Sequence, residues 1–319
     1  MRGVILDCDT LGPDDLEFSA LFDLPVEWTV HASCPPSEVV ERILDAEIVM
    51  TNKTLINADT LSKAPNLKLI SVLATGTNVV DLEAARAQGI VVCNAVNYGT
   101  ASVVQHTWTL ILALTINLQP YNQAVMDGWW AQSESFCLLN YPVRELAGKT
   151  LGIVGAGDLG KGVAKIAEAF EMNVVFAALS GRTYSDKLPR VELHKLLPMV
   201  DILSLHCPLT AQTQNLIASE ELRLMKESAV LINTARGPLI DETALRKALG
   251  DGEIAGAGLD VLSAEPPVDG NALLDSSIPN LIITPHSAWA AVESRQRLVG
   301  QMVENVGAFL DGSVLRRVN

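Results

Sequence analysis

The sequence is poor in basic residues, in aromatic residues and in cysteine. Its 319 residues include 23 Lys and Arg against 37 Asp and Glu, which gives a formal net charge of −14. A surface this acidic repels phosphate backbones and anionic lipids, so we expect neither nucleic acid nor a membrane as a partner. Hydrophobic residues nevertheless make up 49% of the chain, which excludes a disordered protein. The length predicts about two domains at roughly 150 residues each.

Cysteine is too scarce and too scattered to form a disulfide framework. The number of cysteines is odd and none belongs to a Cys-x-x-Cys pair, which also argues against a zinc site. The first residues run directly into a strand-like segment with no signal-peptide pattern. We therefore expect a cytoplasmic protein with ordinary thiols at Cys8, Cys34, Cys93, Cys137 and Cys207.

Charge is missing altogether from residues 87–126. This segment still carries several Asn and Gln side chains, too many for a bilayer span of about 20 apolar residues. A buried helix at a domain or subunit boundary explains the pattern better. His106 lies on this helix with no partner nearby, and we expect neither His106 nor His206 to be catalytic or to bind a metal.

What the sequence does have is a regular alternation of short β-branched runs and helical stretches. Strands are predicted in two series, at residues 4–6, 28–31, 48–51, 69–73 and 90–93, and at 151–154, 174–177, 202–206, 230–233, 254–259 and 281–284. Strands that are apolar throughout are typical of parallel sheets buried on both faces, hence of an α/β fold. Long helices are predicted at 98–118 and 288–310, and this pair would connect two lobes.

The first chemical motif is Gly155-Ala156-Gly157-Asp158-Leu159-Gly160, which follows one predicted strand and opens a helix. Its glycines permit a tight turn, close approach of a pyrophosphate and close helix–strand packing, while the helix N-terminus attracts the anion. A plain glycine turn is the alternative. The strand–turn–helix context favours dinucleotide binding.

The end of the next strand departs from the usual NAD pattern. An Asp or Glu about 20 residues after the glycines normally holds the ribose hydroxyls of NAD. Here no carboxylate occurs between Glu171 and Asp186, and Ser180 and Arg182 stand where a 2′-phosphate would lie. Arg182 could also be a solvated loop residue. We predict that NADP is preferred and that NAD is still usable.

Three further candidates, Arg236, Glu265 and His286, each follow a different predicted strand. In open α/β sheets, ligands bind at the carboxyl ends of the strands, so these side chains could converge. Taken singly, each also has a purely structural explanation, as a surface Arg, a solvated Glu or a capping His.

The N-terminal residues offer a different interpretation. The strand that ends in Asp7-Cys8-Asp9-Thr10 resembles the first motif of haloacid-dehalogenase-type phosphatases, and the Asp14-Asp15 pair resembles that of metal-binding nucleoside hydrolases. The later motifs of such enzymes are not recognisable. We therefore expect no metal site, and we interpret these residues as the first strand and its solvated turn.

Four ordered segments, at residues 155–160, 233–237, 259–267 and 284–288, together resemble the D-isomer-specific 2-hydroxyacid dehydrogenase family. Residues 6–11, 286–290 and 295–298 are similar to its glycerate dehydrogenase/hydroxypyruvate reductase branch. The resemblance implies two Rossmann-like or flavodoxin-like parallel-sheet domains. An NAD(P)-binding domain at 99–287 would be inserted into a split substrate-binding domain at 1–98 and 288–319. It also implies a homodimer, which would bury the uncharged segment and the Trp129–Trp130 loop.

The resemblance also assigns roles to single residues. Arg236 would bind the substrate carboxylate, His286 would donate a proton to the carbonyl oxygen, and Glu265 would orient the imidazole and favour its protonated form. The implied substrate contacts are Lys53, Thr75, Gly76, Thr77, Arg236 and Trp289. The implied cofactor contacts, besides residues 155–160, Ser180 and Arg182, are Cys207, Pro208, Thr213, Thr234, Ala235, Asp260, His286 and Ala288.

The predicted function is therefore NAD(P)-dependent reduction of a small 2-oxoacid of the hydroxypyruvate or glyoxylate type. D-lactate, phosphoglycerate and formate or phosphonate dehydrogenases remain alternatives, although Trp289 after His286 favours the glycerate branch over formate. A dinucleotide-sensing module without catalysis is another alternative. The intact set of Arg236, Glu265 and His286 argues for catalysis, because a sensor needs no proton donor.

Overall fold

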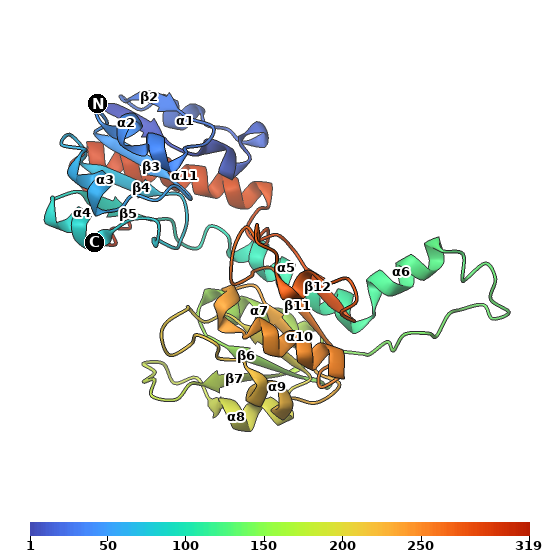
Figure 1. Cartoon of the computed structure of the whole chain (residues 1–319). Coiled ribbons are helices and arrows are strands. Elements are labelled where there is room, and N and C mark those ends of the chain that lie inside the picture. Colours follow the sequence, from blue (N-terminus) through green and yellow to red (C-terminus); the bar gives the residue numbers. More distant parts are fainter. The chain divides into compact units, whose positions relative to one another are not determined.

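The computed structural model describes all 319 residues, which separate into two compact units. One unit consists of Met1–Gly99 together with Trp289–Asn319, and the other of Thr100–Ala288. The second unit is thus an insertion within the chain of the first, and each unit has its own parallel sheet (Figure 1). The predicted α/β fold class, with one unit inserted into a split one, is confirmed.

The first unit is a five-stranded parallel sheet covered on both faces. Its strands are β1 (Arg2–Ile5), β2 (Glu27–Val30), β3 (Ile48–Thr51), β4 (Leu69–Val72) and β5 (Val91–Cys93), in the order β2-β1-β3-β4-β5. One face packs against α2 (Val39–Ile43), α3 (Ala58–Ser62) and α4 (Leu82–Ala87). The other packs against α1 (Ser19–Phe22) and α11 (Val292–Leu310). Because successive side chains point to opposite faces, the central strands β3 and β4 are buried along their whole length, whereas the edge strand β2 is mostly exposed.

The second unit is a seven-stranded parallel sheet in the order β12-β11-β10-β9-β6-β7-β8. Its strands are β6 (Thr150–Val154), β7 (Asn173–Ala178), β8 (Arg190–Glu192), β9 (Ile202–Leu205), β10 (Val230–Asn233), β11 (Gly256–Leu259) and β12 (Leu281–Ile283). Helices α5 (Thr100–Thr115) and α7 (Asp158–Ala169) pack on one face. Helices α8 (Leu193–Leu196), α9 (Ser219–Leu224) and α10 (Glu242–Asp251) pack on the other. The chain order reverses between β6 and β9, which is where ligands bind in such sheets.

The predicted helix at 98–118 corresponds to α5, and a second, unpredicted helix follows it directly. Asn117 has a left-handed backbone with φ of 53°, so α5 ends and α6 (Leu118–Met126) starts in a new direction. No single helix of the structure is long and apolar enough to span a membrane, although α5 and α6 taken together reach that length and composition across a 60° bend.

Two other elements differ from the sequence-based expectation. Strand β8 was not predicted, because its three residues are mostly polar and pair only at the edge of the sheet. The last helix starts at Val292 rather than at residue 288, because the backbone N–H groups of Ser287 and Ala288 donate to the Asp260 carboxylate and form a turn instead.

Candidate active site

The glycine turn after β6 has the geometry that a dinucleotide pyrophosphate requires. Gly155 has φ of 109°, and a Cβ there would lie 2.5 Å from the carbonyl oxygen of His206. A Cβ on Gly160 would lie 2.0 Å from the carbonyl oxygen of Gly155. Gly157 faces open space at the start of α7, with no atom within 4 Å of its Cβ position. Two glycines thus allow the turn to close and the third leaves room for a ligand at the helix N-terminus.

The loop after β7 presents a cation where NAD-specific enzymes place a carboxylate. Arg182 is exposed, and its guanidinium lies 6.0 Å from the centre of the Tyr184 ring, whose hydroxyl accepts from Leu179 N at 2.8 Å. Arg190 lies 4.0 Å from the same ring and forms two hydrogen bonds with Asp186. The Arg190 hydrogen bonds are the main reason that the pKa of Asp186 falls to about 2. The carboxylate nearest to Arg182 in the sequence is therefore already paired with a cation.

The loop after β9 lies close to this cation. Burial raises the pKa of the Cys207 thiol to about 11, and the charge of Arg182 is near enough to oppose that rise. Thr213 is buried and closes the loop, since its hydroxyl donates to the carbonyl of Pro208 at 2.8 Å and accepts from Thr210 N at 2.7 Å. The loops after β7 and β9 thus leave the carboxyl end of the sheet on either side of β6, where the adenosine is expected.

His206, at the end of β9, is a packing residue, as its position in the motif suggested. It is buried, its Nε2 lies 2.8 Å from the Ser204 hydroxyl, and its Nδ1 has no partner. Burial lowers the pKa of His206 to about 4. The imidazole is neutral and has no route to a substrate.

Glu265 and His286, which are far apart in the sequence, meet at the carboxyl end of the sheet. A Glu265 carboxylate oxygen lies 2.6 Å from Nδ1 of His286, and its other oxygen accepts from Leu262 N at 2.8 Å. Both side chains are about one-third exposed. The pairing fixes the orientation of the ring and leaves Nε2 as the nitrogen that can give or take a proton.

Arg236 follows β10 and His286 follows β12. In the sheet, β11 lies between these two strands. The Asn233 side chain shapes the turn, because it donates to the carbonyl of Arg236 and accepts from Ala235 N. Gly237 lets the chain pass close to Leu262, where a Cβ would lie 2.0 Å from backbone atoms. The guanidinium is exposed, contacts only the carbonyl of Ala235 and takes part in no ion pair. A cation without a carboxylate partner is available to an anionic ligand.

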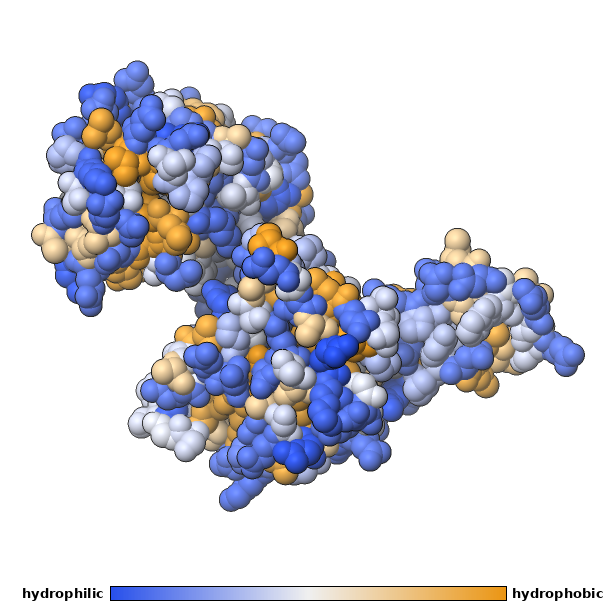
Figure 2. All heavy atoms as spheres, viewed as in Figure 1, coloured by the Kyte–Doolittle hydropathy of each residue, from blue (hydrophilic) through white to orange (hydrophobic).

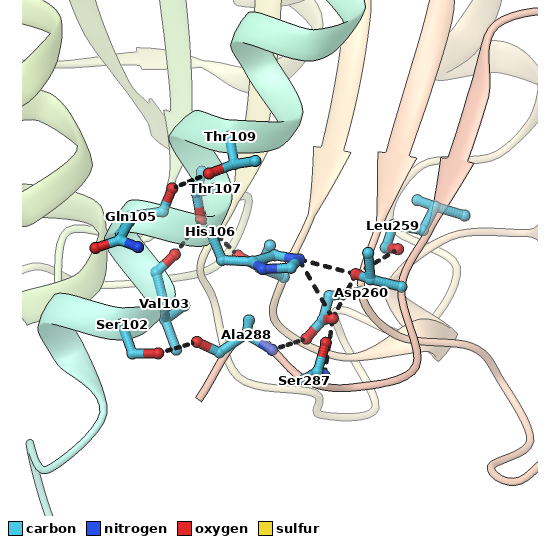
Figure 3. A network of polar contacts seen from close by, with 12 residues as sticks. Ser102, Val103, Gln105, His106, Thr107, Thr109, Leu259, Asp260, Ser287 and Ala288 are labelled. Carbon is cyan, nitrogen blue, oxygen red and sulfur yellow. Dashed lines mark hydrogen bonds and ion pairs between the residues drawn. The ribbon is translucent and has the colours of Figure 1, made fainter. Parts of the chain in front are cut away.

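Asp260, after β11, is the centre of a buried polar network (Figure 3). Its carboxylate accepts from the Thr284 hydroxyl at 2.5 Å and from Ser287 N and Ala288 N at 2.9 Å each. His106, on α5, has its Nε2 at 2.8 Å from the Thr284 hydroxyl and 3.5 Å from Asp260. The expectation that His106 has no partner is therefore wrong. Its partners are remote in sequence and only the fold brings them together. The Thr234 hydroxyl forms a hydrogen bond with the hydroxyl of Thr107, which lies next to His106 on α5.

The residues that were predicted to bind substrate, apart from Arg236, lie in the first unit. Lys53 belongs to the turn after β3, and the buried Asp7 carboxylate holds this turn by accepting from the backbone N–H groups of residues 52–54 and from the Thr54 hydroxyl. Residues 75–77 follow β4, and the Asn94 side chain donates to the carbonyl of Thr75. Trp289 packs edge-to-face on Tyr98, with ring centres 6.4 Å apart.

These contacts explain the N-terminal Asp motif without a metal. Asp7 is buried and its carboxylate accepts hydrogen bonds from the neighbouring turn. Asp15 forms an ion pair with Arg295 of α11. No group of three or more His, Cys, Asp or Glu side chains is arranged to hold a metal ion. All five cysteines are free thiols.

Two hydrogen-bond networks, around Asp260 and around Asp7, were not predicted from the sequence. The residues missed are His106, Thr284 and Asp7. Only Asp7 carried a signal, because it directly follows an apolar strand, and the expectation of a solvated turn is wrong for Asp7, which is buried. His106 and Thr284 are 178 residues apart, and no local pattern connects them.

Comparison with known proteins agrees with this geometry. The family model described as "D-isomer specific 2-hydroxyacid dehydrogenase, NAD binding domain" matches residues 108–288. A glycerate dehydrogenase of Methylorubrum extorquens is 48% identical, covering 97% of this chain and 96% of its own. A hydroxypyruvate reductase of Blautia hydrogenotrophica is 41% identical over the full length of both chains. The crystal structure of an NADPH-dependent glyoxylate/hydroxypyruvate reductase from Sinorhizobium meliloti has a TM-score of 0.83 and 29% identity, covering 99% of this chain and 97% of its own.

Proposed function

Because this chain belongs to the D-isomer-specific 2-hydroxyacid dehydrogenase family, we propose that it reduces a small 2-oxoacid of the hydroxypyruvate or glyoxylate type. The family is one of oxidoreductases that act on CH–OH groups. The hydrogen-bonded pair of Glu265 and His286 at the end of the nucleotide-type sheet carries the proposal. The relatives described above are named as enzymes of glycerate, hydroxypyruvate and glyoxylate, and these names support a small 2-oxoacid as the substrate.

In the proposed reaction, each charged residue acts on a different part of the substrate. Arg236 binds the carboxylate of the 2-oxoacid and draws electron density from the neighbouring carbonyl. A dinucleotide cofactor held at the Gly155–Gly160 turn would supply the hydride for the carbonyl carbon. His286 donates the Nε2 proton to the carbonyl oxygen as the alcohol forms, and Glu265 balances the charge of the imidazolium beforehand and holds the ring in place.

We propose NADP as the preferred cofactor and NAD as a usable one. Gly155, Gly157 and Gly160 fit the pyrophosphate shared by both cofactors. Ser180 and Arg182 would supply a hydroxyl and a guanidinium to a 2′-phosphate, and Asp186, the next carboxylate along the chain, is already paired with Arg190. The further proposed cofactor contacts are Ala156, Asp158, Leu159, Cys207, Pro208, Thr213, Thr234, Ala235, Asp260, His286 and Ala288.

Substrate contacts are also proposed for the first unit, which we infer to be the substrate-binding domain. Lys53 would add a cation, the N–H groups of Gly76 and Thr77 would donate to the carboxylate, and Trp289 would add an apolar wall. The free thiols favour a reducing compartment, so we propose a cytoplasmic location.

The test is the oxidation of NADPH by the purified protein with a panel of 2-oxoacids. Hydroxypyruvate and glyoxylate should be reduced faster than pyruvate or phosphohydroxypyruvate. His286→Ala should lower turnover by orders of magnitude and leave NADPH affinity intact, whereas Arg236→Ala should lower both turnover and substrate binding. His194→Ala is the matched control, since His194 forms a surface pair with Glu221. Cofactor binding without turnover on any 2-oxoacid would refute the proposal and favour a sensor.

A homodimer is proposed from the exposed apolar side chains of α6 and the segment that follows it. α6 projects from the sheet of its unit (Figure 1), and the segment returns along it, with Tyr121 and Tyr141 packed edge-to-face. Met126, Phe136 and Leu139 are 75%, 89% and 85% exposed. Figure 2 shows apolar residues among polar ones on the exposed surface here. Such a surface is typical of a protein contact.

Sedimentation velocity at micromolar concentration tests this association. The wild type should sediment as a dimer, and a double Phe136→Ser, Leu139→Ser variant should shift toward monomer. Val268→Ser is the matched control, because Val268 is 82% exposed in another loop of the same unit. A monomeric wild type would refute the dimer.

A further inference from the structure

Asp260 and His106, both labelled in Figure 3, are joined through the hydroxyl of Thr284. The three residues come from α5, from the end of β11 and from the end of β12. His106 is 21% exposed and Asp260 is 1% exposed, so the contact is largely shielded from water. Hydrogen bonds to a carboxylate in such surroundings are stronger than average.

The hydrogen bonds that link His106, Thr284 and Asp260 allow only one assignment of donors and acceptors. A carboxylate only accepts, and Asp260 already accepts from Ser287 N and Ala288 N. The Thr284 hydroxyl has one proton, and its 2.5 Å contact with Asp260 is much shorter than its 3.5 Å contact with the carbonyl of Leu259. Thr284 therefore donates to Asp260. It follows that Nε2 of His106 donates to the Thr284 oxygen, which fixes the tautomer of a neutral His106.

The same carboxylate holds the turn that carries His286. Ser287 N and Ala288 N donate to the side chain of Asp260, while His286 N donates to its backbone carbonyl at 2.8 Å. His286 itself has φ of 52°, a left-handed conformation that non-glycine residues adopt only at a cost in free energy. A strained turn persists only while its surroundings hold it, and here Asp260 accepts four hydrogen bonds from the turn.

We propose that His106 is a positioning residue, which acts through Thr284 and Asp260 to hold the 284–288 turn and thereby orients His286. The consequence for catalysis rests on the proposed function, whereas the consequence for the turn does not. His106 touches none of the reacting groups in this scheme. Its contribution is a single N–H that keeps Thr284 directed at Asp260, whose carboxylate in turn accepts from the two backbone amides that follow the proton donor.

Paired variants separate this role from simple packing. His106→Leu removes the donor and His106→Gln retains an N–H at the place of Nε2. Thr284→Val removes the hydroxyl at nearly constant shape, and Thr284→Ser restores it. His194→Leu controls for the loss of a partly exposed histidine, because His194 lies on α8 and pairs with Glu221.

The first measurement is amide hydrogen exchange at Ser287 and Ala288 in the full chain without cofactor. His106→Leu and Thr284→Val should accelerate exchange at both amides by about tenfold or more, whereas His106→Gln, Thr284→Ser and His194→Leu should stay near wild type. Unchanged exchange in His106→Leu would overturn the proposal. This result does not depend on any activity, so it stands even if the wild type reduces no 2-oxoacid.

The second measurement is steady-state kinetics of 2-oxoacid reduction. His106→Leu and Thr284→Val should lower kcat about tenfold or more, because a small displacement of a catalytic group has a large effect on rate, and should leave the substrate KM within about twofold. His106→Gln and Thr284→Ser should recover most of kcat. Faster exchange with an unchanged kcat, or a His106→Gln variant as slow as His106→Leu, would overturn the proposal.

Discussion

Replacing Gly157 by Ala should separate cofactor binding from folding, because a Cβ at this position meets only open space. Gly157 has φ of −76° and ψ of −171°, which an Ala residue adopts without strain, and no atom lies within 4 Å of the Cβ position. Replacing Gly by Ala at a compatible position restricts the unfolded chain and stabilises a protein by about 0.4–1 kcal/mol. Urea unfolding without cofactor should therefore show a stability equal to or slightly above that of the wild type.

The same methyl group should weaken cofactor binding. It occupies the space through which a pyrophosphate approaches the start of α7. Loss of one backbone hydrogen bond to a charged oxygen costs about 1.5–3 kcal/mol, which is roughly tenfold to a hundredfold in Kd. Fluorescence titration with NADPH measures this change directly.

Gly160→Ala is the matched control, because a Cβ there would lie 2.0 Å from a backbone oxygen. This variant should lose about 3 kcal/mol of stability even without cofactor. If Gly157→Ala bound NADPH within twofold of wild type, or unfolded as easily as Gly160→Ala, the assignment of separate roles to these glycines would be wrong.

Three further predictions concern other parts of the chain. Arg182→Ala should lower the ratio of kcat/KM for NADPH over NADH by about tenfold to a hundredfold, and a wild type that favours NADH would contradict this assignment. Asp7→Asn should lower the free energy of unfolding by about 3 kcal/mol, because an amide group would face backbone donors, whereas the exposed Asp9→Asn should change it little in the same urea titration. Between pH 6.5 and pH 4 the unfolded chain protonates His206 while the native state does not, so stability should fall by about 3 kcal/mol, and His206→Gln should lack this component of the pH dependence.

The sequence was sufficient wherever the determining pattern is local. Strands that are buried on both faces are apolar throughout, so the sheets of both units could be predicted from short runs of residues. The Gly155–Gly160 turn could also be predicted, because the need for its three glycines arises within one strand–helix connection. The exception is β8, whose short polar sequence has no such pattern.

The polar networks could not be predicted, because they depend on how strands are ordered in the sheet. Glu265 and His286 were predicted as partners only through the family resemblance, since their separation of 21 residues corresponds to no helical or strand period. His106, Asp260 and Thr284 meet because α5 packs across β10, β11 and β12, a neighbourhood that single-sequence patterns do not specify. Helix ends were misplaced for a related reason, since Asn117 and the Asp260 carboxylate end or delay helices through contacts with remote residues.

The split of the first unit across the chain also has a consequence during protein synthesis. Residues 1–99 leave the ribosome before residues 100–288, but one face of their sheet is covered by Leu298, Val299, Met302 and Val306 of α11, which is made after the inserted unit. The inserted unit is continuous and can fold while that face is still bare. We therefore expect the nascent first unit to expose Ile5, Ile48, Met50 and Leu69 for most of translation, in the form that holding chaperones recognise, and to become compact only when the final helix emerges.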